Sequence, residues 1–153
     1  MKAVLQRVYN ATVYADGELS GSIGYGLYVL LGVEKDDTEN EALILCEKIL
    51  KLRIFSDENG KMNLSLLDIG GEMMVVSNFT LNANYAHGNR PDYFGGAAPE
   101  LAEELYLKFI DLSKERISRV ECGRFGADMR TDMSTDGPVT IVMSTDILKK
   151  KGK

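Results

Sequence analysis

Histidine and cysteine are scarce in this sequence of 153 residues. It contains one histidine, His87, and two cysteines, Cys46 and Cys122, which lie far apart and form no Cys-x-x-Cys pair. A catalytic zinc ion needs several such ligands close together, so the composition excludes one. A Ser-His-Asp triad would have to use His87, yet no Gly-x-Ser-x-Gly elbow is present. Catalysis must therefore rest on backbone groups, hydroxyl groups and water, with no metal and no cofactor.

Long apolar runs and nucleotide-binding motifs are also missing. The longest apolar run, residues 27–33, suits a buried strand and is too short to cross a membrane. The first residues enter a strand-like pattern at once, without the apolar segment of a signal peptide. Gly24-Tyr25-Gly26 lacks the third glycine of a dinucleotide fingerprint, and there is no P-loop. We expect a cytoplasmic protein that does not bind membranes.

The formal net charge of −5 is acidic. A positive field over the whole surface therefore cannot be the basis of nucleic-acid binding. A local basic face can still meet phosphates, with modest and salt-sensitive affinity. The lysines at the end of the chain, in a basic and flexible tail predicted over residues 145–153, are either a solvated terminus or an RNA contact.

The pattern of apolar residues predicts one domain over residues 1–153, with about eight strands and two helices. Thr38 and Glu41 form a capping box before a helix over 39–52, and Pro99 begins the second helix. The fold class is α+β, with a mostly antiparallel or mixed, barrel-like sheet curled around the helices. Strands are expected at 2–9, 11–15, 22–33, 53–55, 61–66, 72–79, 117–122, 128–133 and 138–145.

Three segments place unusual residues at strand ends or in the irregular stretch 80–98. A loop of that length in a compact domain is functional or disordered. Each segment is also compatible with ordinary turn chemistry, in which Gly, Pro, Ser and Thr satisfy local backbone requirements. The segments are Ser77-Asn78-Phe79-Thr80-Leu81, Gly88-Asn89-Arg90-Pro91-Asp92-Tyr93 and Asp136-Gly137-Pro138-Val139-Thr140.

Together with three further segments, they resemble the D-aminoacyl-tRNA deacylase family. The further segments are Gln6-Arg7-Val8, Leu52-Arg53-Ile54-Phe55 and Phe125-Gly126-Ala127-Asp128-Met129. The likeness runs in order from Met1 to about Met143. The family motif reads Ser-Gln-Phe-Thr, so Asn78 departs from it, and Thr135-Asp136 stands where the family carries Asn-Asp. Asn78 keeps the amide of glutamine but is one methylene shorter.

The resemblance implies a hydrolase for the ester that joins a D-amino acid to the 3′-terminal adenosine of tRNA. Backbone N–H groups around Phe79 and Thr80 would stabilise the developing oxyanion, and the ribose 2′-hydroxyl would assist. The Thr80 hydroxyl is either a nucleophile or a positioning group, and the lack of an evident base favours positioning. The catalytic residues implied are Ser77, Asn78, Phe79 and Thr80.

The resemblance also implies a homodimer. In the family a cis Gly-Pro pair, here Gly137-Pro138, enters the partner's pocket, accepts from the substrate ammonium and leaves no room for an L side chain. Glycine mischarged on tRNA would be cleared as well, because it has no side chain to reject. The substrate-binding residues expected are Gly137, Pro138, Val139, Thr140, Arg7 and Met129.

Several alternatives remain open at this point. Arg7 is a charge in an apolar strand, so a salt-bridged or interface arginine competes with a substrate contact. Met129 and Phe125 either line the pocket or pack in the core. The chain also resembles the chirality-checking module of archaeal threonyl-tRNA synthetases and the animal deacylase with a trans Gly-Pro. A non-catalytic nucleic-acid-binding dimer with the same fold is the alternative function, and Asn78 keeps it open.

Overall fold

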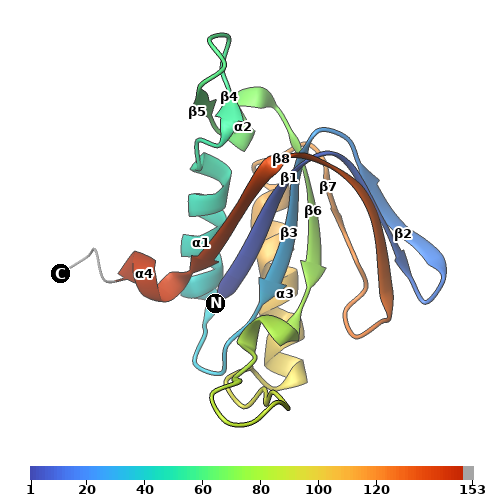
Figure 1. Ribbon diagram of the computed structural model, residues 1–153, viewed down its shortest axis with the longest axis vertical. Helices are drawn as coiled ribbons and strands as arrows, with labels where there is room; N and C mark the ends of the chain where they lie inside the picture. Colours follow the sequence, from blue (N-terminus) through green and yellow to red (C-terminus); the bar gives the residue numbers. More distant parts are fainter. Residues whose placement is uncertain (150–153) are drawn as a thin grey trace.

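A mixed sheet dominates the fold. The structure, a computed structural model, describes residues 1–149 (Figure 1). The strand order is β2-β1-β3-β6-β7, and β8 also pairs with β1. β6 is parallel to β3 and β7, whereas every pairing of β1 is antiparallel. The strands are β1 (Lys2–Ala15), β2 (Glu18–Ile23), β3 (Gly26–Gly32), β6 (Glu72–Ser77), β7 (Val120–Cys122) and β8 (Met129–Ser144).

Two long helices cover one face of this sheet. α1 (Glu39–Lys51) and α3 (Pro99–Lys114) lie side by side behind it (Figure 1). The capping box of α1 is present, because Thr38 and Glu41 answer each other's backbone N–H groups. The predicted α+β class with a barrel-like sheet is thus confirmed. The smaller elements are β4 (Phe55–Ser56), β5 (Met62–Leu64), α2 (Leu66–Ile69), the 3₁₀ turn η1 (Phe79–Asn82) and α4 (Thr145–Lys149).

Several predicted boundaries are wrong, and long-range pairing explains them. β1 and β8 are each continuous where two strands were expected, because the two strands pair with each other from Lys2 to Ala15 of β1. The strand expected over 22–33 is split at Gly24 and Tyr25 into parts of β2 and β3. The predicted flexible tail is helix α4 over 145–149, and its remainder, residues 150–153, lies outside the described residues.

Alternating residues of the strands build two apolar layers. Leu27, Val29 and Leu31 of β3 face the helices and belong to the main core, together with residues of α1 and α3. Tyr28 belongs to a second cluster on the other side of the sheet, beneath the curled half of β1. Because side chains of a strand alternate between its two faces, the central strands contribute to both layers.

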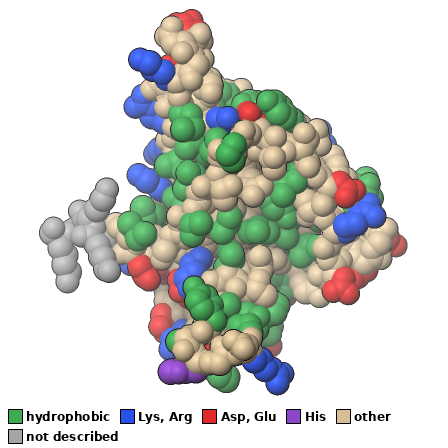
Figure 2. Space-filling view, in the orientation of Figure 1, with side chains coloured by type: hydrophobic (Ala, Val, Ile, Leu, Met, Phe, Trp, Pro, Cys, Tyr) green, Lys and Arg blue, Asp and Glu red, His purple; other side chains and the backbone are tan. Residues whose placement is uncertain are grey.

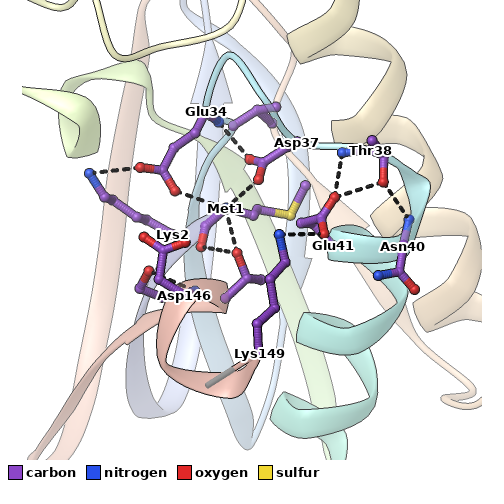
Figure 3. A network of polar contacts seen from close by, with 12 residues as sticks. Met1, Lys2, Glu34, Asp37, Thr38, Asn40, Glu41, Asp146 and Lys149 are labelled. Carbon is purple, nitrogen blue, oxygen red and sulfur yellow. Dashed lines mark hydrogen bonds and ion pairs between the residues drawn. The ribbon is translucent and has the colours of Figure 1, made fainter. Parts of the chain in front are cut away.

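A buried ion cluster joins the start of β1 to the segments that follow β3 and β8 (Figure 3). The α-ammonium of Met1 is fully buried and donates to Asp37 Oδ1 at 2.6 Å, Thr145 Oγ1 at 2.8 Å and Glu34 Oε2 at 2.9 Å. The amide of Thr145 in turn donates to the Met1 carbonyl at 3.0 Å. The cluster therefore ties the start of β1 to the β3–α1 loop and to α4.

Replacing Asp37 with Asn should lower the free energy of unfolding by about 3 kcal/mol, because it removes one charge of a buried pair. The exposed neighbour supplies the control, since Asp36→Asn makes the same chemical change on the surface. Urea unfolding followed by circular dichroism measures both variants. Equal stability of the two variants would contradict the structural role of Asp37.

A second buried carboxylate holds α4 against α1. Glu41 accepts from the Thr38 amide and hydroxyl, and from Lys149 Nζ, each at 2.7 Å. Burial acts to raise the pKa of Glu41, but these hydrogen bonds and the Lys149 charge lower it from 4.5 to about 2. The ionised form of Glu41 is therefore the one that stabilises the fold.

The contribution of Glu41 should be complete above pH 4.5 and should disappear as the pH falls towards 2. Its folded pKa is depressed, so the unfolded chain takes up the proton first. Lys149 is half exposed, which screens the pair and limits the effect to on the order of 1–2 kcal/mol. Urea unfolding of the wild type and Glu41→Gln between pH 7 and 2.5 measures it. A stability difference that does not change with pH would argue against this assignment.

Candidate functional site

A pocket of about 540 Å³ opens where β3 and β6 end. Its position follows from the topology, because binding sites in parallel sheets form beyond the carboxyl ends of the strands. The walls come from the ends of these two strands, the loop before α3, the first turns of α3 and the segment before β8. Residues lining it include Ser77, Asn78, Phe79, Ala102, Phe125 and Met129. The pocket thus gathers three predicted catalytic residues and Met129, and Phe125 also lines it.

Asn78 organises the turn at the mouth of this pocket. Its main-chain N–H donates to the Leu31 carbonyl at 2.8 Å, which fixes the residue to the end of β3. Its side-chain oxygen caps η1 by accepting from the Thr80 amide at 3.2 Å, and it also accepts from the Thr80 hydroxyl. The departure from the family glutamine therefore has a structural role. The preference of Asn for N-cap positions was the signal in the sequence.

Thr80 and Phe79 differ in what they offer to a substrate. Thr80 is exposed, but its hydroxyl is engaged with the Asn78 side chain, which is an amide and not a base. That contact favours positioning over nucleophilic attack. Phe79 is 66% exposed and stands edge-on to Tyr93 with ring centroids 5.0 Å apart. The two rings form an aromatic rim around an opening that can take a planar group.

The floor of the pocket is rigid and apolar. The buried Tyr106 hydroxyl donates to the carbonyls of Val75 at 3.0 Å and Gly123 at 3.3 Å. Burial raises the pKa of Tyr106 far above its usual range, so the phenol stays neutral. The Phe125 ring packs against the Tyr106 ring, with the two ring centroids 5.9 Å apart. The sequence did not predict Tyr106 as a residue of the site.

The Gly137-Pro138 corner is an exposed interruption in the β1–β8 ladder. Gln6 pairs with Thr140 and Val8 pairs with Thr135, so four residues of β8 stand opposite Arg7 alone. The surplus residues, 136–139, bend out of the ladder as a bulge does. The Gly137–Pro138 peptide bond is cis.

Arg7 is occupied within its own chain. Its Nη1 donates to the Ile54 carbonyl at 2.7 Å, and its Nε lies 2.9 Å from Asp136 Oδ2. Tyr25 donates to the same carboxylate at 2.8 Å. Burial acts to raise the pKa of Asp136, but the Tyr25 hydrogen bond and the Arg7 charge lower it below its usual range. The structure therefore favours the salt-bridged arginine over a direct substrate contact.

The corner and the pocket lie at opposite ends of the sheet. Val8, beside the corner, pairs with Gly26 at the start of β3, whereas Leu31 at the other end of β3 lines the pocket. Five residue steps along a strand correspond to roughly 17 Å. The structure does not bring Gly137, Pro138, Val139 or Thr140 to the pocket of their own chain. His87 is exposed in the loop and does not line the pocket either.

Within residues 1–149, no group of three or more His, Cys, Asp or Glu side chains could hold a metal ion. In the same part of the chain, no helix is long and apolar enough to cross a membrane.

Comparison with known proteins identifies the family. Residues 4–144 match the family described as D-Tyr-tRNA(Tyr) deacylase. The D-aminoacyl-tRNA deacylase of Thermosipho africanus is 50% identical over 145 residues, which cover 95% of this chain and 97% of that protein. The deacylase of Photorhabdus laumondii is 51% identical over 140 residues, which cover 92% and 97% of the two chains.

Solved structures agree with these matches. A protein described as c-Myc DNA unwinding element binding protein superposes with a TM-score of 0.88 at 41% identity, covering 94% of this chain and 98% of the other. A probable eukaryotic D-amino acid tRNA deacylase superposes with a TM-score of 0.81 at 16% identity, covering 93% and 97%, and supports the fold alone.

Fold, pocket and relatives define an enzyme class, the hydrolases that act on ester bonds. The chain belongs to the D-Tyr-tRNA(Tyr) deacylase family, and its function is the deacylation of D-aminoacyl-tRNA.

Removing the Asn78 side chain should lower kcat/KM on D-tyrosyl-tRNA about fivefold, because a helix cap contributes roughly 1 kcal/mol and here it orders the Thr80 amide. Asn78→Gln restores the residue of the family motif and should leave activity equal or higher. Asn89→Ala, in the exposed loop, is the control. Wild-type rates for Asn78→Ala in single-turnover assays would show that the cap does not matter for catalysis.

Proposed function

We propose that this enzyme proofreads the chirality of aminoacyl-tRNA as a homodimer, with each site built from the pocket of one chain and the Gly137-Pro138 corner of the other. The separation of pocket and corner along β3 is the observation that carries this proposal. An exposed corner that is separated from its own pocket by about five residue steps of β3, roughly 17 Å along the strand, can complete a site only in a second chain.

The pocket is suited to hydrolysis without a strong base. An aminoacyl ester is already activated, so a water molecule needs orientation more than deprotonation, and the neighbouring ribose 2′-hydroxyl assists it. The Thr80 amide already donates to Asn78. We therefore assign the developing oxyanion mainly to the Phe79 amide at the start of η1, with Thr80 as its support. A preorganised donor of this kind lowers the barrier by several kcal/mol.

Chiral selection falls to main-chain groups of the corner. Carbonyls of Gly137 and Pro138 accept from the substrate α-ammonium and fix its direction. A D side chain then points into the pocket, whereas an L side chain would meet the corner itself. Glycine has no side chain to reject, so glycine mischarged on tRNA is a second substrate. Val139 and Thr140 continue the corner and support its position against β1.

An apolar face supports the homodimer. Figure 2 shows hydrophobic side chains gathered over β1, β3 and β8. On β8 Val142 is 76% exposed, and it pairs with Val4 of β1 on the same face. Two positions along, Gln6 Oε1 is buried and has no hydrogen-bond partner among residues 1–149. A second copy packed on this face would cover the apolar surface and can supply a donor for Gln6.

The proposed substrate sets the remaining assignments. Aminoacyl-tRNA is made and used in the cytosol, and we assign the enzyme to that compartment. A non-catalytic nucleic-acid-binding dimer is the second candidate, because a structure 41% identical to this chain is described as a DNA unwinding element binding protein. The two candidates differ in one measurable property, the hydrolysis of the ester.

The wild-type protein should hydrolyse D-tyrosyl-tRNA and leave L-tyrosyl-tRNA intact, with a mass in light scattering of twice 16.9 kDa. Gly137→Ala should lose activity on the D-substrate, because an added Cβ would lie 2.2 Å from the Val139 amide nitrogen. Gly24→Ala is the control, since its Cβ meets no atom closer than 3.7 Å.

Two outcomes would contradict the proposal. A fully active monomer would show that the site is not shared between two chains. Binding of tRNA without hydrolysis would favour the non-catalytic nucleic-acid-binding dimer.

A further inference from the structure

Exposed basic side chains line one edge of the molecule. Lys48 and Lys51 lie near the end of α1, Arg53 follows the helix, and Lys61 stands just before β5. All four are exposed, and Figure 2 shows Lys and Arg side chains along this edge, over α1 and the β4–β5 hairpin. We call these four residues the basic edge. Neither the pocket nor the corner uses them.

The charge of the molecule is unevenly distributed. The chain carries a net charge of −5, yet residues 47–61 together with Arg116 contain five basic and three acidic side chains. Acidic side chains gather on the opposite side of the view in Figure 2, near the β1–β2 turn, where Asp16 and Glu18 are exposed. A polyanion that approaches this molecule is therefore turned with the basic edge towards it.

The carboxylates next to the basic edge leave part of its charge unopposed. Glu47 is shared between two cations, Lys51 and Arg116. Asp57 accepts from the backbone amides of Asn59 and Lys61 in the hairpin turn, so it serves that turn. These surface pairs are weak in water and exchange readily for phosphate contacts.

The basic edge is fixed to the Gly137-Pro138 corner. Arg7 bridges the two, because it binds the Ile54 carbonyl next to Arg53 and the carboxylate of Asp136. The Tyr25 ring packs edge-on against Phe55 of β4 at 5.6 Å, and its hydroxyl binds Asp136. The basic edge and the corner therefore hold a fixed position relative to each other.

We propose that the basic edge of one chain binds the sugar-phosphate backbone of the tRNA whose aminoacyl end lies in the partner's pocket. This inference rests on the proposed function, in which the corner enters that pocket. The basic edge then flanks the mouth of the pocket, where the acceptor end of the tRNA must leave. Lysines contact phosphates without reading bases, which suits an enzyme that must act on many tRNAs.

The test compares Lys48→Gln/Lys61→Gln with a control of equal charge change, Lys35→Gln/Lys108→Gln. Binding of uncharged tRNA to the dimer should weaken about tenfold at 150 mM salt in the first variant, and the slope of log affinity against log salt should fall by about two. Hydrolysis of D-tyrosyl-adenosine, which lacks phosphates, should stay at the wild-type rate. The control variant should match the wild type in all three measurements.

Unchanged tRNA affinity in Lys48→Gln/Lys61→Gln, or an equal loss in the control, overturns the proposal. The proposed function fails differently. If the wild type hydrolyses neither D-tyrosyl-tRNA nor D-tyrosyl-adenosine while the first variant still loses tRNA affinity, the basic edge binds RNA and the assigned reaction is wrong.

Mixed dimers test whether the basic edge serves the partner's pocket. One chain carries Lys48→Gln/Lys61→Gln, and the other carries Ala102→Phe, which fills its own pocket. In the mixed dimer the open pocket faces the intact basic edge of the other chain, so kcat/KM on D-tyrosyl-tRNA should recover to about half the wild-type value per dimer. Activity of only about half that of the Lys48→Gln/Lys61→Gln homodimer shows that each basic edge serves its own pocket and overturns the arrangement.

Discussion

The antiparallel ladder between β1 and β8 determines where the Gly137-Pro138 corner lies relative to the pocket. It pairs the first strand with the last one over almost the whole length of β1, from Lys2 to Ala15. Its backbone hydrogen bonds fix the register, and a slip of one residue would turn each buried side chain outwards. Residues 136–139 have no room in this register and bend out as the corner. The ladder thereby creates the exposed corner and holds it away from the pocket.

The buried charge of Arg7 fixes the position of the Gly137-Pro138 corner. Its guanidinium lies among apolar strands, and it is compensated by the Asp136 carboxylate and the Ile54 carbonyl. Such pairs add little net stability, but removing one partner is costly because the other stays buried. The arrangement is therefore best understood as a device for orientation. It holds the corner against β4, and Arg7 Nε also donates to the Asp136 main-chain carbonyl at 3.1 Å.

Much of the fold could be predicted from local signals. The capping box of α1, the proline that begins α3 and the Asn-Gly turn between β4 and β5 all act through neighbouring residues, and all were found in the sequence. The continuity of β8 could not be predicted, because Gly137 and Pro138 are local strand breakers and only the pairing with β1 overrides them. Helix α4 depends on Thr145 binding Met1 at the other end of the chain.

For the candidate site too, the local motif could be predicted from the sequence, but the long-range contacts could not. The strand end at Ser77 to Thr80 was recognised from its motif, whereas the cap made by Asn78 needed the actual turn geometry. Tyr106 was missed because a buried tyrosine on a helix has the same pattern as any core residue. The occupation of Arg7 could not be predicted either, because its partners lie 47 and 129 positions away.

The pairing of the first strand with the last also has a consequence for synthesis of the protein. Met1 and Thr145, which close the ladder, are 144 positions apart. While the ribosome is still making the chain, β1 has no β8 to pair with, and its apolar face stays open. The entropic cost of closing so long a loop is offset only when β8 forms its contacts with β1. In a growing chain, β1 therefore lacks this antiparallel partner until β8 has been made, and partly made chains of this kind expose apolar strand surface.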